Sequence, residues 1–125
     1  MCGINGFISD TFLMEQKKTV VSKMNAKIAH RGPDNEGIWN DEDVCLGHRR
    51  LSIIDLSIDG NQPFFSADKR YVIVYNGELY NYKDLKLELQ RTAQGSTIPP
   101  YFFKTASDTE VILAAFIRWG NKCLD

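Results

Sequence analysis

The sequence predicts an α+β fold, and two patterns point to it. Short runs of apolar and β-branched residues, bounded by turn-forming residues, indicate about five strands. Three other segments carry apolar residues three or four positions apart, which is typical of helices that pack on a core. With 125 residues, 43% of them hydrophobic, the chain can form one domain with a core of its own.

The strands are expected mainly before residue 76. Residues 2–8 form a short apolar run with two glycines, which indicates a buried strand at the N-terminus. Residues 37–39 and 44–54 are expected to be strands joined by the turn-like residues 40–43. Residues 71–75 (Tyr-Val-Ile-Val-Tyr) are aromatic and β-branched, which is typical of a central strand. The middle of the chain should therefore be mostly sheet.

Three helices are expected around this region. The first runs from residue 11 to about residue 29 and is stopped by Gly32-Pro33. The second covers residues 81–93, and an exposed loop is expected around residues 92–100. The third begins at a capping box, ends near Gly120 and should bury an apolar face made by Ile112, Ala115, Phe116 and Trp119.

Charge and cysteine usage exclude several classes of protein. Fifteen basic and 16 acidic residues are interspersed, so nucleic acid and anionic membranes are not expected as partners. No apolar stretch approaches the ~20 residues that cross a bilayer, and no signal peptide is visible, so we expect a cytoplasmic protein. Cys2, Cys45, Cys123, His30 and His48 lack the close spacings of zinc ligands or of a disulfide framework, so we expect no metal site.

Cys2 becomes the terminal residue if Met1 is removed, which changes its chemistry. A free α-amino group has a pKa of about 7.7 to 8.0, so part of it is unprotonated near neutral pH. It can then accept the thiol proton through a water, and nucleophile and base share one residue. The alternative is that Cys2 is a small buried hydrophobe in the first strand.

Arg49 and Arg50 lie in an otherwise apolar strand, where successive side chains point to opposite faces. Only one of them reaches solvent easily, and the other needs an anion. A substrate carboxylate would bind a guanidinium through two hydrogen bonds. An internal salt bridge to one of the acidic residues is the alternative, and the residues alone do not decide between the two.

Polar groups are also expected at the end of the strand over residues 71–75. Asn76-Gly77 is followed by a helical pattern, so the Asn76 amide and the Gly77 N–H could form an oxyanion hole, or the pair could simply make a turn. Asp108 is expected at the first helical position, where a carboxylate is favourable without any further role.

Six motifs, taken together and in order, resemble the N-terminal glutaminase domain of asparagine synthetases. They are Met1-Cys2-Gly3-Ile4, His30-Arg31-Gly32-Pro33-Asp34, residues 47–55 (Gly-His-Arg-Arg-Leu-Ser-Ile-Ile-Asp), Asn61-Gln62-Pro63, Asn76-Gly77-Glu78 and Ser107-Asp108-Thr109-Glu110. The resemblance covers nearly the whole chain. Met-Cys-Gly-Ile alone is shared by several class II glutamine amidotransferases, whereas the second and third motifs look most like the asparagine synthetase branch.

The resemblance implies an N-terminal nucleophile hydrolase fold, with four layers of helix, sheet, sheet and helix. Cys2 would attack the side-chain amide of L-glutamine, Asn76 and Gly77 would hold the oxyanion, and a γ-glutamyl thioester would form. Arg50 would bind the α-carboxylate, and the Ile53 and Ile54 backbone would line the site. Glu78 and Asp108 would bind the α-ammonium.

The resemblance also sets expectations for what accompanies residues 1–125. The family's domain continues past Asp125 with strands that complete the second sheet, so the four-layer fold is expected to be incomplete here. An ATP-dependent synthetase domain or subunit would receive the ammonia, and ATP and Mg²⁺ are expected only there, with no cofactor in the glutaminase reaction. Homo-oligomers are a further option. The alternative to an enzyme is an inactive fragment that serves as an interaction or regulatory module and self-associates through exposed sheet edges.

Overall fold

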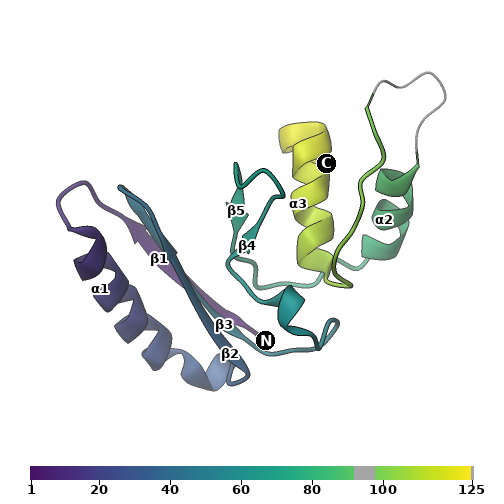
Figure 1. Ribbon diagram of the computed structural model, residues 1–125. Coiled ribbons are helices and arrows are strands. Elements are labelled where there is room, and N and C mark those ends of the chain that lie inside the picture. The colour runs from purple at the N-terminus through teal and green to yellow at the C-terminus, as the bar shows by residue number, and fades with distance from the viewer. Residues whose placement is uncertain (92–97, 125) are drawn as a thin grey trace.

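The computed structural model describes residues 1–91 and 98–124, and it has α+β architecture (Figure 1). Strands β1 (Gly3–Ile8), β2 (Asn35–Asn40) and β3 (Val44–Arg50) form an antiparallel sheet in the order β1-β3-β2. Strands β4 (Phe64–Phe65) and β5 (Val72–Ile73) form a second, two-stranded antiparallel sheet. The helices are α1 (Met14–Lys27), α2 (Tyr82–Gln90) and α3 (Asp108–Trp119), with 3₁₀ turns η1 (Ala29–Arg31), η2 (Ile58–Gly60) and η3 (Gly120–Leu124).

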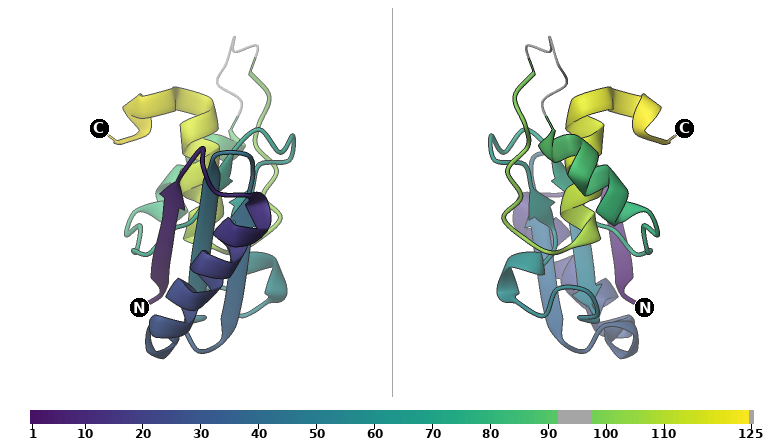
Figure 2. Two further views of the ribbon diagram at one scale, coloured as in Figure 1. Left: turned by 90° about the vertical axis from the view of Figure 1, so that its left-hand side faces the viewer. Right: turned by 90° about the vertical axis from the view of Figure 1, so that its right-hand side faces the viewer.

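Helix α1 covers one face of the three-stranded sheet, while the β4-β5 sheet, α2 and α3 lie on the other side (Figures 1 and 2). Val21 of α1 is fully buried against this sheet. The helix can lie close because β3 carries Gly47 beneath it, where a Cβ atom would stand 2.6 Å from the Val21 side chain. Packing of α1 therefore holds β1 and β3 in a fixed relation at the N-terminal end of the chain.

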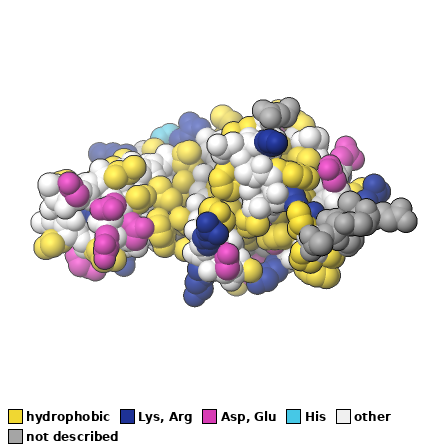
Figure 3. Space-filling model, turned by 90° about the horizontal axis from the view of Figure 1, so that it is seen from above, with side chains coloured by type: hydrophobic (Ala, Val, Ile, Leu, Met, Phe, Trp, Pro, Cys, Tyr) yellow, Lys and Arg dark blue, Asp and Glu magenta, His cyan; other side chains and the backbone are white. Residues whose placement is uncertain are grey.

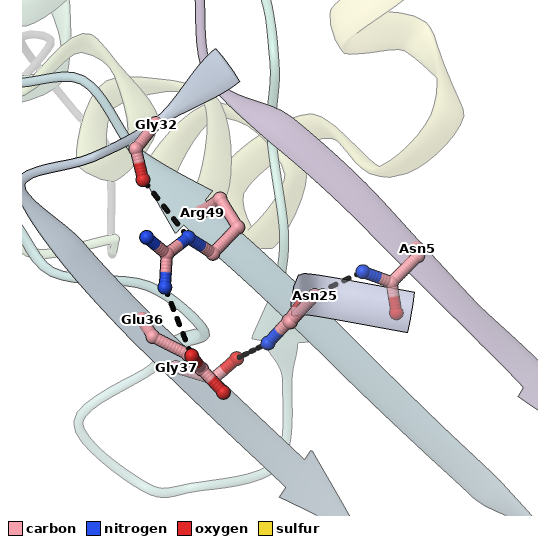
Figure 4. A network of polar contacts seen from close by, with 6 residues as sticks. All are labelled: Asn5, Asn25, Gly32, Glu36, Gly37 and Arg49. Carbon is pink, nitrogen blue, oxygen red and sulfur yellow. Dashed lines mark hydrogen bonds and ion pairs between the residues drawn. The ribbon is translucent and has the colours of Figure 1, made fainter. Parts of the chain in front are cut away.

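A network of polar side chains joins α1 to the three-stranded sheet (Figure 4). The Asn25 side chain of α1 accepts a hydrogen bond from the Asn5 amide of β1 at 2.5 Å and donates one to the Gly37 carbonyl of β2 at 3.2 Å. One buried side chain thus links both edge strands, which satisfies polar groups that would otherwise be costly to bury.

The main apolar core lies between α2 and α3. Leu89 of α2 packs with Val111, Ala114 and Ala115 of α3, and all four are buried. Tyr71 beside β5 contacts Phe116 of α3 edge to face, with ring centroids 5.5 Å apart. This packing holds α3 against α2 and against the chain that leads into β5.

Several predicted elements differ from the structure. The first strand is only partly buried, and Ile8 at its end is 78% exposed, because β1 is an edge strand of the sheet. The strand expected over residues 44–54 ends at Arg50, and the one expected over residues 71–75 is reduced to Val72–Ile73. The residues that follow each shortened strand lie in loops, and residues of both loops line the same cavity. β4 was not anticipated.

The helices begin and end near their predicted bounds, with corrections in detail. α2 ends at Gln90, and most of the loop expected over residues 92–100, including Ala93, lies outside the described residues. The capping box of α3 forms only in part, because Ser107 accepts from the Thr109 N–H while Glu110 bonds elsewhere. The buried apolar residues of α3 are Val111, Leu113, Ala114 and Ala115. Of the predicted face, only Ala115 is therefore buried, while Ile112, Phe116 and Trp119 are half-buried. Within the part of the chain that is described, no helix has both the length and the apolar character to cross a membrane.

Candidate active site

A cavity of about 350 Å³ lies between the end of β3, the segment after β5 and the first turn of α3. All eight residues singled out from the sequence line it: Cys2, Arg50, Ile53, Ile54, Asn76, Gly77, Glu78 and Asp108. They come from four separate stretches of chain, which the two sheets and α3 bring together. The volume is of the size expected for a small-molecule site.

Cys2 lies one residue before β1 and faces this cavity. Its thiol donates to the Leu51 carbonyl at 3.6 Å, and the Leu51 N–H donates to the same sulfur at 3.4 Å. Because β1 pairs with β3, the thiol sits beside the point where β3 leaves the sheet. The residue is half-buried, so the alternative of a cysteine sealed in the core is wrong.

The two neighbouring arginines of β3 have separate partners. Arg49 forms an ion pair with Glu36 of β2 at 2.9 Å and donates to the Gly32 carbonyl at 2.9 Å (Figure 4). Arg50 points to the cavity side and is only 6% exposed, and it has no ion pair among the described residues. The salt-bridge interpretation therefore holds for Arg49 and fails for Arg50.

The Arg50 guanidinium is oriented by the loop it contacts. Nη1 donates to the Ser57 carbonyl and to Asn61 Oδ1, each at 2.6 Å, and Nη2 donates to the Asp55 carbonyl. Of the five N–H groups of an arginine, the Nε–H and one on Nη2 thus have no partner among the described residues. Two remaining donors on a buried cation are what a bidentate carboxylate requires.

Asn76, Gly77 and Glu78 follow β5 as irregular chain and face the cavity. Asp108 anchors this segment, because its carboxylate accepts the Leu79 N–H at 3.0 Å. Asp108 is the first residue of α3, as predicted, but it has a role beyond the helix dipole. At Gly77 a Cβ atom would stand 2.5 Å from the Tyr75 hydroxyl, so a side chain at this position would displace that phenol.

Negative charge gathers at this wall of the cavity. Burial, together with the nearby carboxylates of Asp108 and Glu78, raises the pKa of the Tyr75 phenol. The same two carboxylates would favour a cationic group in the cavity. Arg50 and this acidic wall give one cavity both signs of charge, which suits a zwitterion.

Sequence reasoning did not single out other residues of the cavity wall, among them Tyr75, Gln62 and Thr109. Gln62 lies in the Asn61-Gln62-Pro63 motif, which was the one signal that could have identified it. Across the described ranges, no group of three or more His, Cys, Asp and Glu side chains is arranged to hold a metal ion.

The whole chain, residues 1–125, matches the model of the family described as glutamine amidotransferase domain. Asparagine synthetase [glutamine-hydrolyzing] 1 of Bacillus subtilis is 44% identical over 98% of this chain and 18% of its own length. Asparagine synthetase [glutamine-hydrolyzing] 3 of the same organism is 39% identical over 100% of this chain and 19% of its own length. The Zea mays asparagine synthetase [glutamine-hydrolyzing] is 34% identical over 100% of this chain and 20% of its own length. The chain thus spans about a fifth of these relatives.

Proposed function

The chain belongs to the glutamine amidotransferase domain family, and on that premise we propose that it hydrolyses L-glutamine to glutamate and ammonia through Cys2. The observation that carries the proposal is the shared cavity, where three kinds of group face one space: the Cys2 thiol, the buried Arg50 cation and two carboxylates. Two donors of that cation have no partner among residues 1–91 and 98–124. A neutral amide substrate would need only part of this arrangement, whereas an amino acid uses all of it.

The proposed reaction begins once Met1 has been removed. The free α-amine of Cys2 takes the thiol proton through a water, and the thiolate attacks the side-chain carbonyl carbon of glutamine. Negative charge develops on the carbonyl oxygen, where the Asn76 amide and the Gly77 N–H donate to it. The C–N bond then breaks, the proton goes to the leaving nitrogen, and ammonia departs to leave a γ-glutamyl thioester. Water attacks the thioester, which releases glutamate and restores the thiol.

Substrate selection follows from the two charged walls. Arg50 binds the α-carboxylate through Nε and Nη2, and Glu78 and Asp108 bind the α-ammonium. The Ile53 and Ile54 backbone lines the space between them. The reaction as written draws on no cofactor.

The ammonia is proposed to pass to an ATP-dependent synthetase domain or subunit, because the relatives named above are glutamine-hydrolysing asparagine synthetases and are about five times as long as this chain. ATP and Mg²⁺ belong to that step. The proposed fold is the four-layer N-terminal nucleophile hydrolase sandwich. The order of α1, three-stranded sheet, two-stranded sheet and α3 across the molecule supports it (Figure 1).

The decisive experiment follows glutamate release from L-glutamine by the chain with Met1 removed. Cys2→Ala is expected to abolish the activity, while Cys45→Ala serves as the matched control because that thiol is fully buried in β3 and away from the cavity wall. Activity that survives in Cys2→Ala, or is lost equally in Cys45→Ala, would refute the proposal.

A second candidate function is a non-catalytic interaction module. Seen from above, apolar side chains cover much of the middle of the molecule, between α1 and the two other helices (Figure 3). Large exposed apolar residues include Phe12 and Phe65. This alternative expects self-association, measured by size-exclusion chromatography, together with no glutamate release. A monomeric, active chain would contradict it.

A further inference from the structure

His48 is fully buried in β3, and the one hydrogen bond that its side chain makes among the described residues reaches across to the segment that carries the proposed oxyanion hole. Its Nε2 lies 3.3 Å from the carbonyl oxygen of Tyr75, the residue directly before Asn76. His48 belongs to the motif over residues 47–55, yet the proposed reaction gives it no role.

The partner atom fixes the protonation of the ring. A carbonyl oxygen only accepts, so Nε2 must carry the proton and Nδ1 must be bare in the neutral imidazole. Burial, with a smaller contribution from the Arg50 cation, lowers the pKa of His48 to about 4, so the ring is neutral near pH 7. Nδ1 is buried without a hydrogen-bond partner in the described part of the chain.

A half-satisfied imidazole is a poor choice for stability alone. A buried polar atom without a partner costs about 1–3 kcal/mol, and an apolar side chain of similar size would avoid that cost. The favourable contribution that only this ring makes is the bond to Tyr75. The position is therefore better explained by what the Tyr75 carbonyl supports than by core packing.

Gln62 holds the same residue from its other side. Its Oε1 accepts the Tyr75 N–H at 2.5 Å, and its Nε2 donates to Thr109 Oγ1 in the first turn of α3 at 3.1 Å. Gln62 is itself buried, and its backbone rests directly on Gly37 of β2, where a Cβ atom would stand 1.9 Å from the Gln62 carbonyl.

The segment is thus held at both ends. Tyr75 is fixed by His48 and Gln62, and Leu79 is fixed by Asp108. Between these points lie Asn76 and Gly77, whose direction depends on the orientation of the Tyr75 peptide units. A donor aimed at a developing charge gives its full effect only when it is held in place beforehand.

We propose that His48 and Gln62 are positioning residues, which fix the Tyr75 backbone and thereby aim the Asn76 amide and the Gly77 N–H at the oxyanion. The inference rests on the proposed glutaminase function. It predicts that the hydrogen bond from His48 affects the chemical step, while substrate binding at Arg50 is unchanged.

The test compares His48→Leu with His48→Gln in the chain with Met1 removed, by steady-state glutamate release. Leucine fills the space but donates no hydrogen bond, so kcat should fall about tenfold or more. This fall should be smaller than the loss of about 10²–10³-fold that follows removal of an oxyanion donor itself. KM for glutamine should stay within about twofold. The glutamine amide reaches about as far as Nε2, so His48→Gln should restore most of kcat.

Two further readouts separate positioning from folding. Alkylation of Cys2 by iodoacetamide needs no oxyanion hole, so its rate should be the same in His48→Leu as in the parent chain. Binding of an aldehyde analogue of glutamine, which forms an oxyanion on Cys2, should weaken about as much as kcat falls. A parental kcat in His48→Leu, or a parallel fall in alkylation, would overturn the inference.

If His48→Leu does not fold, His48→Asn tests the same hydrogen bond. Its shorter amide stops near the position of Nδ1 and cannot reach the Tyr75 carbonyl, so the same fall in kcat is expected. An unchanged kcat, or failure of both variants to fold, would assign His48 to the core and overturn the inference. Loss of activity in Cys2→Ala together with a parental kcat in His48→Leu would leave the glutaminase function standing and remove only the positioning role.

Discussion

At the scale of single residues, the two neighbouring arginines have different environments because side chains alternate along a strand. β3 pairs with β1 and β2, so its register sends Arg49 toward Glu36 and Arg50 toward the cavity. An arginine tied to a surface carboxylate contributes little to binding, whereas a buried one with free donors recognises an anion.

Arg50→Lys should therefore raise KM for glutamine by about tenfold or more, because an ammonium cannot replace the planar fork of donors. The kcat should change less than KM. Arg49→Lys is the matched control and should leave KM near its parental value, since its ion pair with Glu36 lies on the other face. Glutamate release at varied glutamine concentration measures both, and equal effects of the two substitutions would refute the assignment.

Asp55 is expected to make stability depend on pH. Hydrogen bonds from Ser57, and one from the Ala106 N–H, hold the pKa of the Asp55 carboxyl below 3.8. A lowered folded-state pKa contributes stability that is present above the unfolded value and lost as pH falls through the folded value.

Asp55→Asn should therefore lower the free energy of unfolding at pH 7, and the gap between variant and parent should shrink as pH drops below about 4. Urea denaturation at several pH values measures the gap. Asp59→Asn, on an exposed side chain in η2, is the control and should cost less at pH 7. A gap that stays constant down to about pH 2 would contradict the assignment.

At the scale of elements, the start of α3 is held by contacts that differ from a complete capping box. Glu110 is buried, and its carboxylate accepts the N–H groups of Lys104 and Thr105 and the Thr105 hydroxyl. The acid therefore folds the preceding chain onto the helix rather than closing its first turn. The start of α3 that it supports carries Asp108, which accepts the Leu79 N–H, and Thr109, which accepts from Gln62.

Glu110→Gln replaces one carboxylate oxygen by an NH₂ group, which would face the N–H and O–H donors that now bond to Glu110. The substitution should therefore lower the free energy of unfolding by about 1–3 kcal/mol. Urea denaturation of the chain measures the change. Glu88→Gln, on the exposed side of α2, is the control and should shift it by less than about 0.5 kcal/mol. A similar loss in both would show that charge, not the buried contacts, is responsible.

Strand and helix positions followed from the sequence where local pattern and packing agreed. The strand over residues 44–54 was predicted too long because its last residues are apolar, yet Ile53 is 69% exposed and borders the cavity. The strand propensity of an apolar segment does not show whether the segment pairs in a sheet or lines a cavity beside it.

The cavity residues were identified through the family motifs and not through periodicity. Residue chemistry alone left Cys2 and Arg50 with two interpretations each. His48 and Gln62 were missed as site residues because a buried polar side chain has no periodic signal, and its partner becomes visible only when Tyr75 is placed in space.

At the scale of the whole molecule, the site depends on both layers. β3 supplies Arg50 and His48, while the loop after β5 and α3 supply the opposite wall. The layers meet through contacts such as Trp39 of β2 against Phe65 of β4, with ring centroids 6.4 Å apart. Changes that loosen the layers should therefore reduce activity before they unfold either one.

Removal of Met1 should determine whether the chain is active. A retained Met1 turns the Cys2 nitrogen into an amide without a basic lone pair, so such a chain should show no glutamate release. Intact mass spectrometry, read beside activity across partly processed preparations, should show activity in proportion to the species that lacks one methionine. Turnover by a homogeneous Met1-bearing sample would contradict the terminal-amine mechanism.

Met1 is 75% exposed at the rim of the cavity. A peptidase can therefore reach the peptide bond between Met1 and Cys2 without unfolding the domain. The cavity can form first, and the α-amine of Cys2 can be freed afterwards. Removal in the folded state would bring the thiol and its base together in one residue only where a finished cavity already surrounds them.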